Sequence, residues 1–477
     1  MRRKTLSFLL VFCMLFALFP ATASADPLTG TVTLERTGNG SIGDEQTDIE
    51  WNGNTGTQEL ALEGSSPNQV MNAHYNITAD PGYRIKSVAL YTIGADTVPV
   101  RHPFELNVTS GEGGFFGRVL DGGNDLIAGS IRWFAKDGDK LAAEFERTSS
   151  SRDTVVVEGE AGLLLAQTLS GVTRVEVKDT FTIENQETTI TKETEIKNGT
   201  VTISTGAILN IDGCSFGPDF TKAMTNPSKL INNGTINVHS GGELLLIDEN
   251  SGAINVENGA VMEAGVINTG TITVKSGGKA YPVMGKSISN TGQFTVEAGA
   301  TLEPWEGQGF QNAPGGTLTL NGDLIFNEGF WSSFSEGTLE GTGRFIVNIR
   351  MDVAGLQSVV DTANGNGSSL TIVNESVVEL GSGTDFATFK AAANDADVRA
   401  IYLTNCNITI NESLNITNKN IYLESAAALT LDAGNTLTLT DTAGTGFQCG
   451  LISAADNYEH SGGESTSVTV NGRLVLA

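Results

Sequence analysis

The sequence predicts an all-β chain whose central part is a solenoid, and three observations support this fold class. A motif made of Gly, a short alternating strand and a second Gly turn recurs with its first Gly at positions 234, 252, 270 and 292. Self-similarity at a period near 20 residues is typical of solenoids. Each motif alternates apolar and polar residues, which predicts a strand with one buried face. Gly and Asn at the corners permit the positive φ that sharp turns need.

The strands of this array predict a parallel β-helix, in which stacked coils lie about 4.8 Å apart and equivalent residues form ladders. We expect the apolar ladder to fill the interior, and the Thr, Asn and Ser ladders to face water. A leucine-rich repeat is excluded because its Leu-x-x-Leu-x-Leu signature does not occur in the array. The apolar pairs expected inside are Ile236/Val238, Ile254/Val256, Ile272/Val274 and Phe294/Val296.

Residues 1–25 are predicted to be a secretory signal peptide. Cations at positions 2–4 precede an apolar run over 6–19, and an A-x-A cleavage motif ends at Ala25. The run is shorter than the roughly 20 residues that span a bilayer. We therefore expect a secreted, extracellular protein that has no membrane insertion.

The chain is acidic, which bounds its partners. Its formal net charge is −27, and removal of residues 1–25 would take away three cations and no anions, leaving −30. This charge argues against nucleic acid and anionic membranes as partners. Three cysteines remain after cleavage, Cys214, Cys406 and Cys449. An odd number makes a disulfide framework improbable, although Cys406 and Cys449 could pair.

Residues 26–147 are predicted to form a small β-rich module. Its opening, 30–34 and 38–42, predicts a hairpin. The stretch from Tyr75 to Val88 and the closing Leu141 to Arg147 resemble the repeat modules of bacterial surface proteins of the internalin B-repeat kind. That resemblance implies a spacer or a ligand contact rather than an enzyme. The polar segment 148–153 is a linker.

Two β-helix units are predicted after the linker, over 154–360 and 370–477. An apolar stretch at 161–169 and a clearer helix at 384–396, with Thr384 or Asp385 as N-cap, open the two units. The strand at 398–403 matches the one at 172–177, as expected of a tandem repeat. We expect each short helix to cap its unit by covering the exposed edge of the first coil.

The helix and strand over 385–403, followed by 429–439, resemble the pectin-lyase-like right-handed β-helix superfamily, in particular its non-catalytic versions in large surface proteins of Gram-positive bacteria. The resemblance implies a right-handed solenoid with three sheets and does not imply lyase activity. The last residues, 467–477, read as strands without a polar cap. We therefore expect further C-terminal domains beyond the end of this sequence.

The sequence offers little that indicates catalysis or a cofactor. The segment 210–213 matches only the first part of a polygalacturonase pattern, so Asp212 is interpreted as a turn residue, and the array has no Arg between 195 and 300. The four His are scattered without metal-site spacing. The segments 121–125 and 137–139 would be calcium candidates, but they lack EF-hand spacing and fit tight polar turns. No cofactor is expected, with calcium left open.

The candidate ligand-binding residues are aromatic. The chain concentrates aromatic residues between 305 and 334, where they would form a platform for stacking on sugars or, alternatively, a looped-out coil packed on the solenoid. Threonine rows, as at 436–440, also occur on ice-binding surfaces but are generic on β-helices. The residues singled out for ligand binding are Trp305, Phe310, Phe330 and Trp331.

Three function hypotheses follow. The favoured one is a non-enzymatic, adhesin-like or S-layer-associated stalk that binds an extracellular glycan or a surface protein through a β-helix face. The second is a polysaccharide lyase or glycoside hydrolase of the β-helix type, which would need acids clustered on one face. The third is a structural spacer without a ligand.

Overall fold

The structure is a computed structural model, and it divides into two compact units, one up to Asp179 and one from Thr180. The predicted signal peptide lies outside the described residues. The structure describes residues 29–44, 49–63, 69–93, 101–105, 115–218, 228–282, 286–304, 309–326, 331–333, 336–347, 354–373, 377–396, 398–424, 426–440, 450–453 and 467–476.

The first unit contains two mixed β-sheets that share one core. Buried residues from both sheets pack together, among them Leu34, Leu141, Tyr75 and Ile131. One sheet has the order β3 (Glu50–Asn52), β4 (Thr55–Ala61), β1 (Thr29–Thr37), β10 (Lys140–Arg147), β6 (Tyr83–Ile93) and β7 (Arg101–Glu105). The other has the order β2 (Gly40–Gly43), β5 (Met71–Ala79), β9 (Leu126–Ala135), β8 (Phe115–Leu120), β11 (Thr154–Val157) and β12 (Arg174–Val177).

The predicted opening hairpin is wrong, because β1 and β2 belong to different sheets. β1 pairs with β4 and with β10, whereas β2 pairs with β5. The predicted helix is present as α2 (Gly159–Thr168). It packs closely on β8: a Cβ on Gly162 would lie 2.9 Å from the backbone oxygen of Arg118, so only glycine permits this approach. α2 thus contacts the N-terminal sheet.

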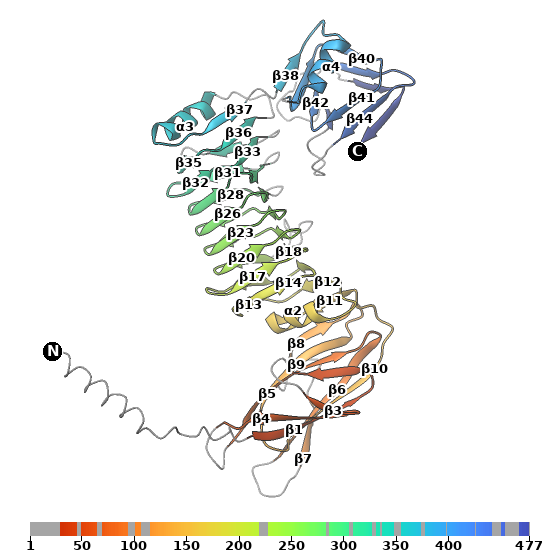
Figure 1. The fold of residues 1–477 in the computed structure, drawn as a ribbon. Coiled ribbons are helices and arrows are strands. Elements are labelled where there is room, and N and C mark those ends of the chain that lie inside the picture. The colour runs from red at the N-terminus through yellow and green to blue at the C-terminus, as the bar shows by residue number, and fades with distance from the viewer. Residues whose placement is uncertain are drawn as a thin grey trace, which may run out of the picture. The chain divides into compact units, whose positions relative to one another are not determined.

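The second unit begins with a parallel β-helix of three sheets, which confirms the central prediction (Figure 1). Sheet I has the order β15 (Glu193–Ile196), β18 (Ser215–Pro218), β21 (Glu243–Leu245), β24 (Val261–Glu263), β27 (Lys279–Tyr281), β30 (Thr301–Leu302), β33 (Asp323–Phe326), β36 (Arg344–Val347) and β37 (Thr371–Val373). Sheet II has the order β13 (Phe181–Ile183), β16 (Thr200–Ile203), β19 (Lys229–Asn232), β22 (Glu249–Asn250), β25 (Ile267–Asn268), β28 (Ile288–Asn290), β31 (Gly309–Asn312) and β34 (Trp331–Ser333). Sheet III has the order β14 (Thr188–Ile190), β17 (Ile208–Ile211), β20 (Thr235–Val238), β23 (Ala253–Val256), β26 (Thr271–Val274), β29 (Gln293–Val296), β32 (Thr317–Leu320) and β35 (Thr338–Gly341).

The apolar pairs predicted for the interior are all buried. Ile236, Ile254, Ile272 and Phe294 pair in register across neighbouring strands of sheet III and are 0 % exposed. The predicted alternation therefore sets the register of the whole array, because a slip by one residue would turn every apolar side chain outward.

One asparagine ladder differs from the expectation that polar ladders face water. It follows the corner between sheets II and III and is almost completely buried. The Nδ2 of each of the first four asparagines donates to the Oδ1 of the next at 2.7–2.8 Å and also to a backbone oxygen at the start of the next sheet III strand, and the Nδ2 of the fifth donates to such a backbone oxygen. Because every amide is satisfied, burial carries no unpaired polar group. The ladder consists of Asn232, Asn250, Asn268, Asn290 and Asn312.

A helix that the sequence analysis did not predict, α3 (Ala354–Gly365), packs beside β35 at the end of this array (Figure 1). Leu356, Val360 and Ala363 are buried, which is the i, i+4, i+7 pattern of an amphipathic helix. Asn364 then exchanges two hydrogen bonds with the backbone of Leu370, and these fix the return of the chain into β37.

The rest of the second unit is a shorter parallel β-helix. The predicted helix is present as α4 (Phe386–Asn394), and the Asp385 carboxylate accepts a hydrogen bond from the Thr388 amide, which confirms Asp385 as N-cap. Its three sheets have the orders β38 (Val377–Leu380), β39 (Ala400–Thr404), β42 (Asn420–Glu424), β45 (Gly450–Ser453); β40 (Asn407–Ile410), β43 (Ala428–Leu431), β46 (Ser467–Val470); and β41 (Leu414–Thr417), β44 (Thr436–Thr440), β47 (Arg473–Leu476).

Candidate functional site

The outer face of sheet III carries two parallel rows of short, mostly polar side chains, one residue per strand in each row. Along each strand, the residues of the two rows alternate with residues whose side chains point into the interior. Both rows therefore face outward on a regular surface. The first row is Ile208, Thr235, Ala253, Thr271, Gln293, Thr317 and Thr338. The second row is Thr189, Asn210, Asn237, Asn255, Thr273, Thr295, Thr319 and Glu340. We call this surface the polar face.

Hydrogen bonds between neighbouring coils order the second row. The Asn255 Nδ2 donates to the Asn237 Oδ1 at 2.9 Å, and the Asn237 Nδ2 donates to the Asn210 Oδ1 at 2.9 Å. At the other end, the Thr319 hydroxyl donates to the Glu340 carboxylate at 2.8 Å. The rows thus hold their groups at the strand spacing of about 4.8 Å. Such a surface can pair hydroxyl and amide groups with an extended ligand whose own polar groups repeat.

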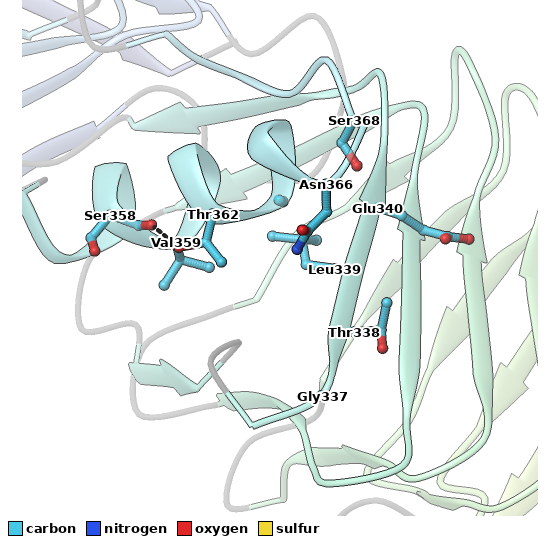
Figure 2. A pocket seen from close by; sticks show the side chains of 10 residues that line it. Gly337, Thr338, Leu339, Glu340, Ser358, Val359, Thr362, Asn366 and Ser368 are labelled. Atoms are coloured by element: carbon cyan, nitrogen blue, oxygen red, sulfur yellow. Dashed lines mark hydrogen bonds between the residues drawn. The ribbon is translucent and has the colours of Figure 1, made fainter.

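An open cavity of about 440 Å³ lies where the polar face ends (Figure 2). β35 is the last strand of sheet III, and its Thr338 and Glu340 end the two rows and line the cavity. Figure 2 shows the side chains of Val359 and Thr362 below α3, with the strand that carries Thr338 beside the helix. The lining residues are Gly337, Thr338, Leu339, Glu340, Ser358, Val359, Thr362, Ala363, Asn366 and Ser368.

A second polar cluster lies on the outer face of sheet I and brings carboxyl groups together with a tyrosine. Glu263 and Tyr281 are paired in register on β24 and β27, and the Tyr281 hydroxyl donates to the Glu263 carboxylate at 2.5 Å. Glu243, on β21, reaches the same carboxylate. Glu303 follows β30 and is 8 % exposed.

Burial and mutual repulsion change the acidity of this cluster. Burial and the neighbouring Glu263 carboxylate raise the pKa of Glu243 above its ordinary value. Burial, followed by the hydrogen bond to Glu263, raises the pKa of Tyr281. The geometry therefore brings a carboxyl group with a raised pKa against a second carboxyl group, and paired carboxyl groups of this kind are used for general acid and general base work.

In another group of charged side chains, the pKa of a carboxyl group is lowered instead of raised. Glu257 accepts a hydrogen bond from the His239 Nδ1 at 2.8 Å and one from the Lys275 Nζ at 3.1 Å. These two contacts, with that of His239 the larger, lower the pKa of Glu257. The three residues lie at the turns that follow β20, β23 and β26, so this row links three consecutive coils.

The predicted aromatic platform is placed only in part. The ring of Phe310 is 0 % exposed and lies inside the β-helix, edge-on to Phe294 with ring centroids 5.1 Å apart. A ring in that position cannot stack on a sugar, so Phe310 is a core residue. Trp331 begins β34, and its side chain is not described. Trp305 and Phe330 lie outside the described residues.

The other candidates behave as turn or core residues. The Asp121 carboxylate accepts hydrogen bonds from the amides of Gly123 and Asp125, which closes a tight polar turn. In the part of the chain that the structure describes, no group of three or more His, Cys, Asp or Glu has the arrangement to hold a metal ion. Burial raises the pKa of the Cys214 thiol to about 11. Cys406 is a free, buried cysteine, and Cys449 lies outside the described residues.

The cluster of Glu243, Glu263, Tyr281 and Glu303 was not predicted from the sequence. Glu263, Tyr281 and Glu303 follow one another at steps of 18 and 22 residues, which are steps of the repeat, so an alignment of the coils would have placed these three in one row. Glu243 lies outside that row, because the register pairs it with Val261 and pairs Glu263 with Leu245. No family model, curated protein or solved structure matches this chain. Over the residues described, no helix is both long and apolar enough to cross a bilayer.

Proposed function

We propose that this chain is a secreted, surface-associated, non-enzymatic protein whose right-handed β-helix, of the non-catalytic pectin-lyase-like kind, binds an extended extracellular glycan along the polar face. The regular double row of Thr, Asn and Gln on sheet III is the observation that carries this proposal. A glycan repeats hydroxyl groups along its length, and a β-helix repeats hydroxyl and amide groups along its axis. The short side chains of the face lose little rotamer entropy on binding.

An array of plant, bacterial and host glycans, probed with residues 26–477, tests the proposal. We expect retention on at least one neutral glycan, and we expect Thr273→Arg to abolish it, because a long side chain in the second row blocks the face. Ser289→Arg places the same side chain on the outer face of sheet II, since Ser289 pairs with the exposed Ile267, and it should leave retention unchanged. Equal loss in both variants, or no retention of the parent protein, would contradict the proposal.

The enzyme hypothesis is kept as a second candidate because of the cluster on sheet I. A lyase or hydrolase needs acids on one β-helix face, and Glu243, Glu263 and Glu303 lie together there with Tyr281. The same array wells, sampled for soluble oligosaccharides with and without calcium, separate the two candidates. Product release that Glu263→Gln abolishes would favour the enzyme, whereas retention without release would favour the binding protein.

A further inference from the structure

The cavity between β35 and α3 has the composition of a sugar site rather than of an ion or lipid site. Five of its lining side chains carry a hydroxyl or an amide: Thr338, Ser358, Thr362, Asn366 and Ser368. Glu340 is the single ionisable residue among the ten that line it. Leu339, Val359 and Ala363 add an apolar patch. Neutral hydrogen-bonding groups around an apolar patch suit the polar edges and the C–H face of a neutral sugar.

The cavity is also continuous with the polar face. Thr338 and Glu340 belong both to the rows and to the lining of the cavity. The Glu340 carboxylate accepts a hydrogen bond from the hydroxyl of Thr319 on the preceding coil. Figure 2 shows the Glu340 side chain reaching away from α3 along the sheet. A glycan that follows the rows toward β35 therefore meets α3, which stands across its path. The volume of about 440 Å³ lies within the roughly 300–1,000 Å³ typical of small-molecule pockets.

The backbone around the cavity is fixed from inside the β-helix. The last rung of the buried asparagine ladder, Asn312, donates from Nδ2 to the Thr338 oxygen at 2.7 Å. On the helix side, the Thr362 hydroxyl donates to the backbone oxygen of Ser358 at 2.8 Å. The backbone amides of Asn366 and Ser368 both donate to the backbone oxygen of Ala363. Both walls are thus held before any ligand arrives, which lowers the entropic cost of binding.

We infer that this cavity binds the terminal unit of a neutral glycan, so that the chain recognises glycan ends rather than only internal segments. The inference deepens the proposed function and rests on it for the path of the glycan along the polar face. Glu340 lies where the rows meet the cavity, and its carboxylate, which points back along the rows, disfavours a uronate or another anionic sugar at that rim.

Saturation-transfer difference NMR with single sugars tests the cavity without relying on the polar face. The probes are glucose, galactose, mannose and N-acetylglucosamine as neutral sugars, with galacturonate as the anionic control, each added to residues 26–477. We expect at least one neutral sugar to give a signal and galacturonate to give none. Glu340→Gln should add a galacturonate signal and keep the neutral one. No neutral signal, or equal signals from galactose and galacturonate in the parent protein, would overturn the inference.

A pair of tryptophan variants on α3 localises the signal. Thr362→Trp fills the cavity from an exposed helix position, and we expect it to abolish the sugar signal. Gln357→Trp adds the same ring to an exposed position of α3 that does not line the cavity, and it should keep the signal. Equal circular dichroism spectra and thermal midpoints for both variants show that they are folded. A signal that survives Thr362→Trp would contradict the inference.

The failure of the cavity and the failure of the proposed function give different results. Sugar signals that depend on Thr362, without retention on any glycan array, would support binding in the cavity and contradict binding along the polar face. Array retention that depends on Thr273 but is unchanged by Thr362→Trp would support binding along the polar face and contradict binding in the cavity. Retention lost in both variants is the result expected if the face and the cavity bind one glycan.

Discussion

The two β-helices of the second unit are built on the same parallel coils but stabilise them differently. The first buries an amide ladder at one corner and packs aromatic rings inside, with Phe294 edge-on to Phe310 and Phe326 tilted against Phe345. The interior of the second, as far as it is described, is mostly Leu and Ile. Its aromatic pair, Tyr402 and Tyr422, stacks on the other face of the sheet, with centroids 4.5 Å apart.

The corners differ as well. In the first β-helix the corner glycines approach the preceding coil so closely that a Cβ on Gly252 would lie 2.0 Å from the Gly234 oxygen. The second has such a glycine as well, since a Cβ on Gly472 would lie 2.4 Å from the Asn435 oxygen, but it has more described non-glycine residues with positive φ. These are Asn405, Asn418 and Ala426, against Leu246 in the first β-helix, and positive φ costs energy for most residues other than glycine. A buried side-chain ladder couples the stability of neighbouring coils, because each amide bonds to the next coil. Backbone strain at a corner affects the stability of that corner alone. Stability changes should therefore be larger in the first β-helix.

The largest expected effect comes from the interior ring of Phe310. Phe310→Ala removes a fully buried ring and its edge contact with Phe294, which should destabilise the protein by about 4 kcal/mol. Urea denaturation followed by circular dichroism measures the loss. Phe310→Leu, which retains most of the volume, should recover more than half of the stability and leave glycan retention unchanged. A loss of retention at full stability would return Phe310 to the ligand platform.

The next effect concerns the buried amide ladder. Asn268→Ala removes the acceptor of Asn250 and the donor to Asn290 and to the Gln293 oxygen, leaving buried polar groups unpaired at a cost of about 3 kcal/mol. The matched control is Asn255→Ala in the outer, part-buried row, where water can reach the lost partner and the cost should stay below about 1 kcal/mol. Equal denaturation midpoints for the two variants would mean that burial adds nothing to the ladder.

A stabilising change is expected at a corner of the second β-helix. Ala426 has φ of 60° and is exposed, so Ala426→Gly relieves left-handed strain and should raise the unfolding free energy by up to about 1 kcal/mol. The reverse change tests the same term: Gly434 has φ of 85° and open space around its Cα, so Gly434→Ala should cost about 1 kcal/mol. Thermal unfolding of both variants provides the measurement. A destabilised Ala426→Gly would show that the corner is held by more than its own backbone.

Much of the fold was predictable because its signals are local and repeated. The buried pairs of sheet III, the N-cap at Asp385 and the parallel stacking follow from alternation and period, which every coil repeats. The interior asparagines were misjudged because an Asn that ends a strand looks the same whether it turns inward or outward. Its inward position depends on the carbonyl oxygens of the next coil, as Asn268 shows with the Gln293 oxygen.

The candidate site was harder to predict, because it depends on which residues face outward on one sheet. Phe310 seemed available for stacking since Trp305 and Trp331 lie close in sequence, yet its ring alternates inward. Glu243 and Glu263 are 20 residues apart, and only the coil register brings them together. α3 was not predicted, because its buried residues Leu356, Val360 and Ala363 form only a short apolar pattern among small polar residues. The cavity beside it could not be predicted without the helix.

The smallest expected effect contrasts two carboxylates of the first β-helix that should respond to pH with opposite sign. The pKa of Glu243 is raised above the ordinary 4.5, so between that value and its folded pKa the folded state binds more protons, and stability falls as pH rises. The pKa of Glu257 is lowered, so its contribution is present above 4.5 and is lost as pH falls through its folded pKa. At pH 7, Glu243→Gln should therefore be more stable than the parent and Glu257→Gln less stable. Because Gln imitates the protonated carboxyl, both differences should shrink toward pH 3, and urea midpoints at the two pH values measure them. Shifts of the same sign in both variants would mean that burial and Glu263 do not raise the pKa of Glu243.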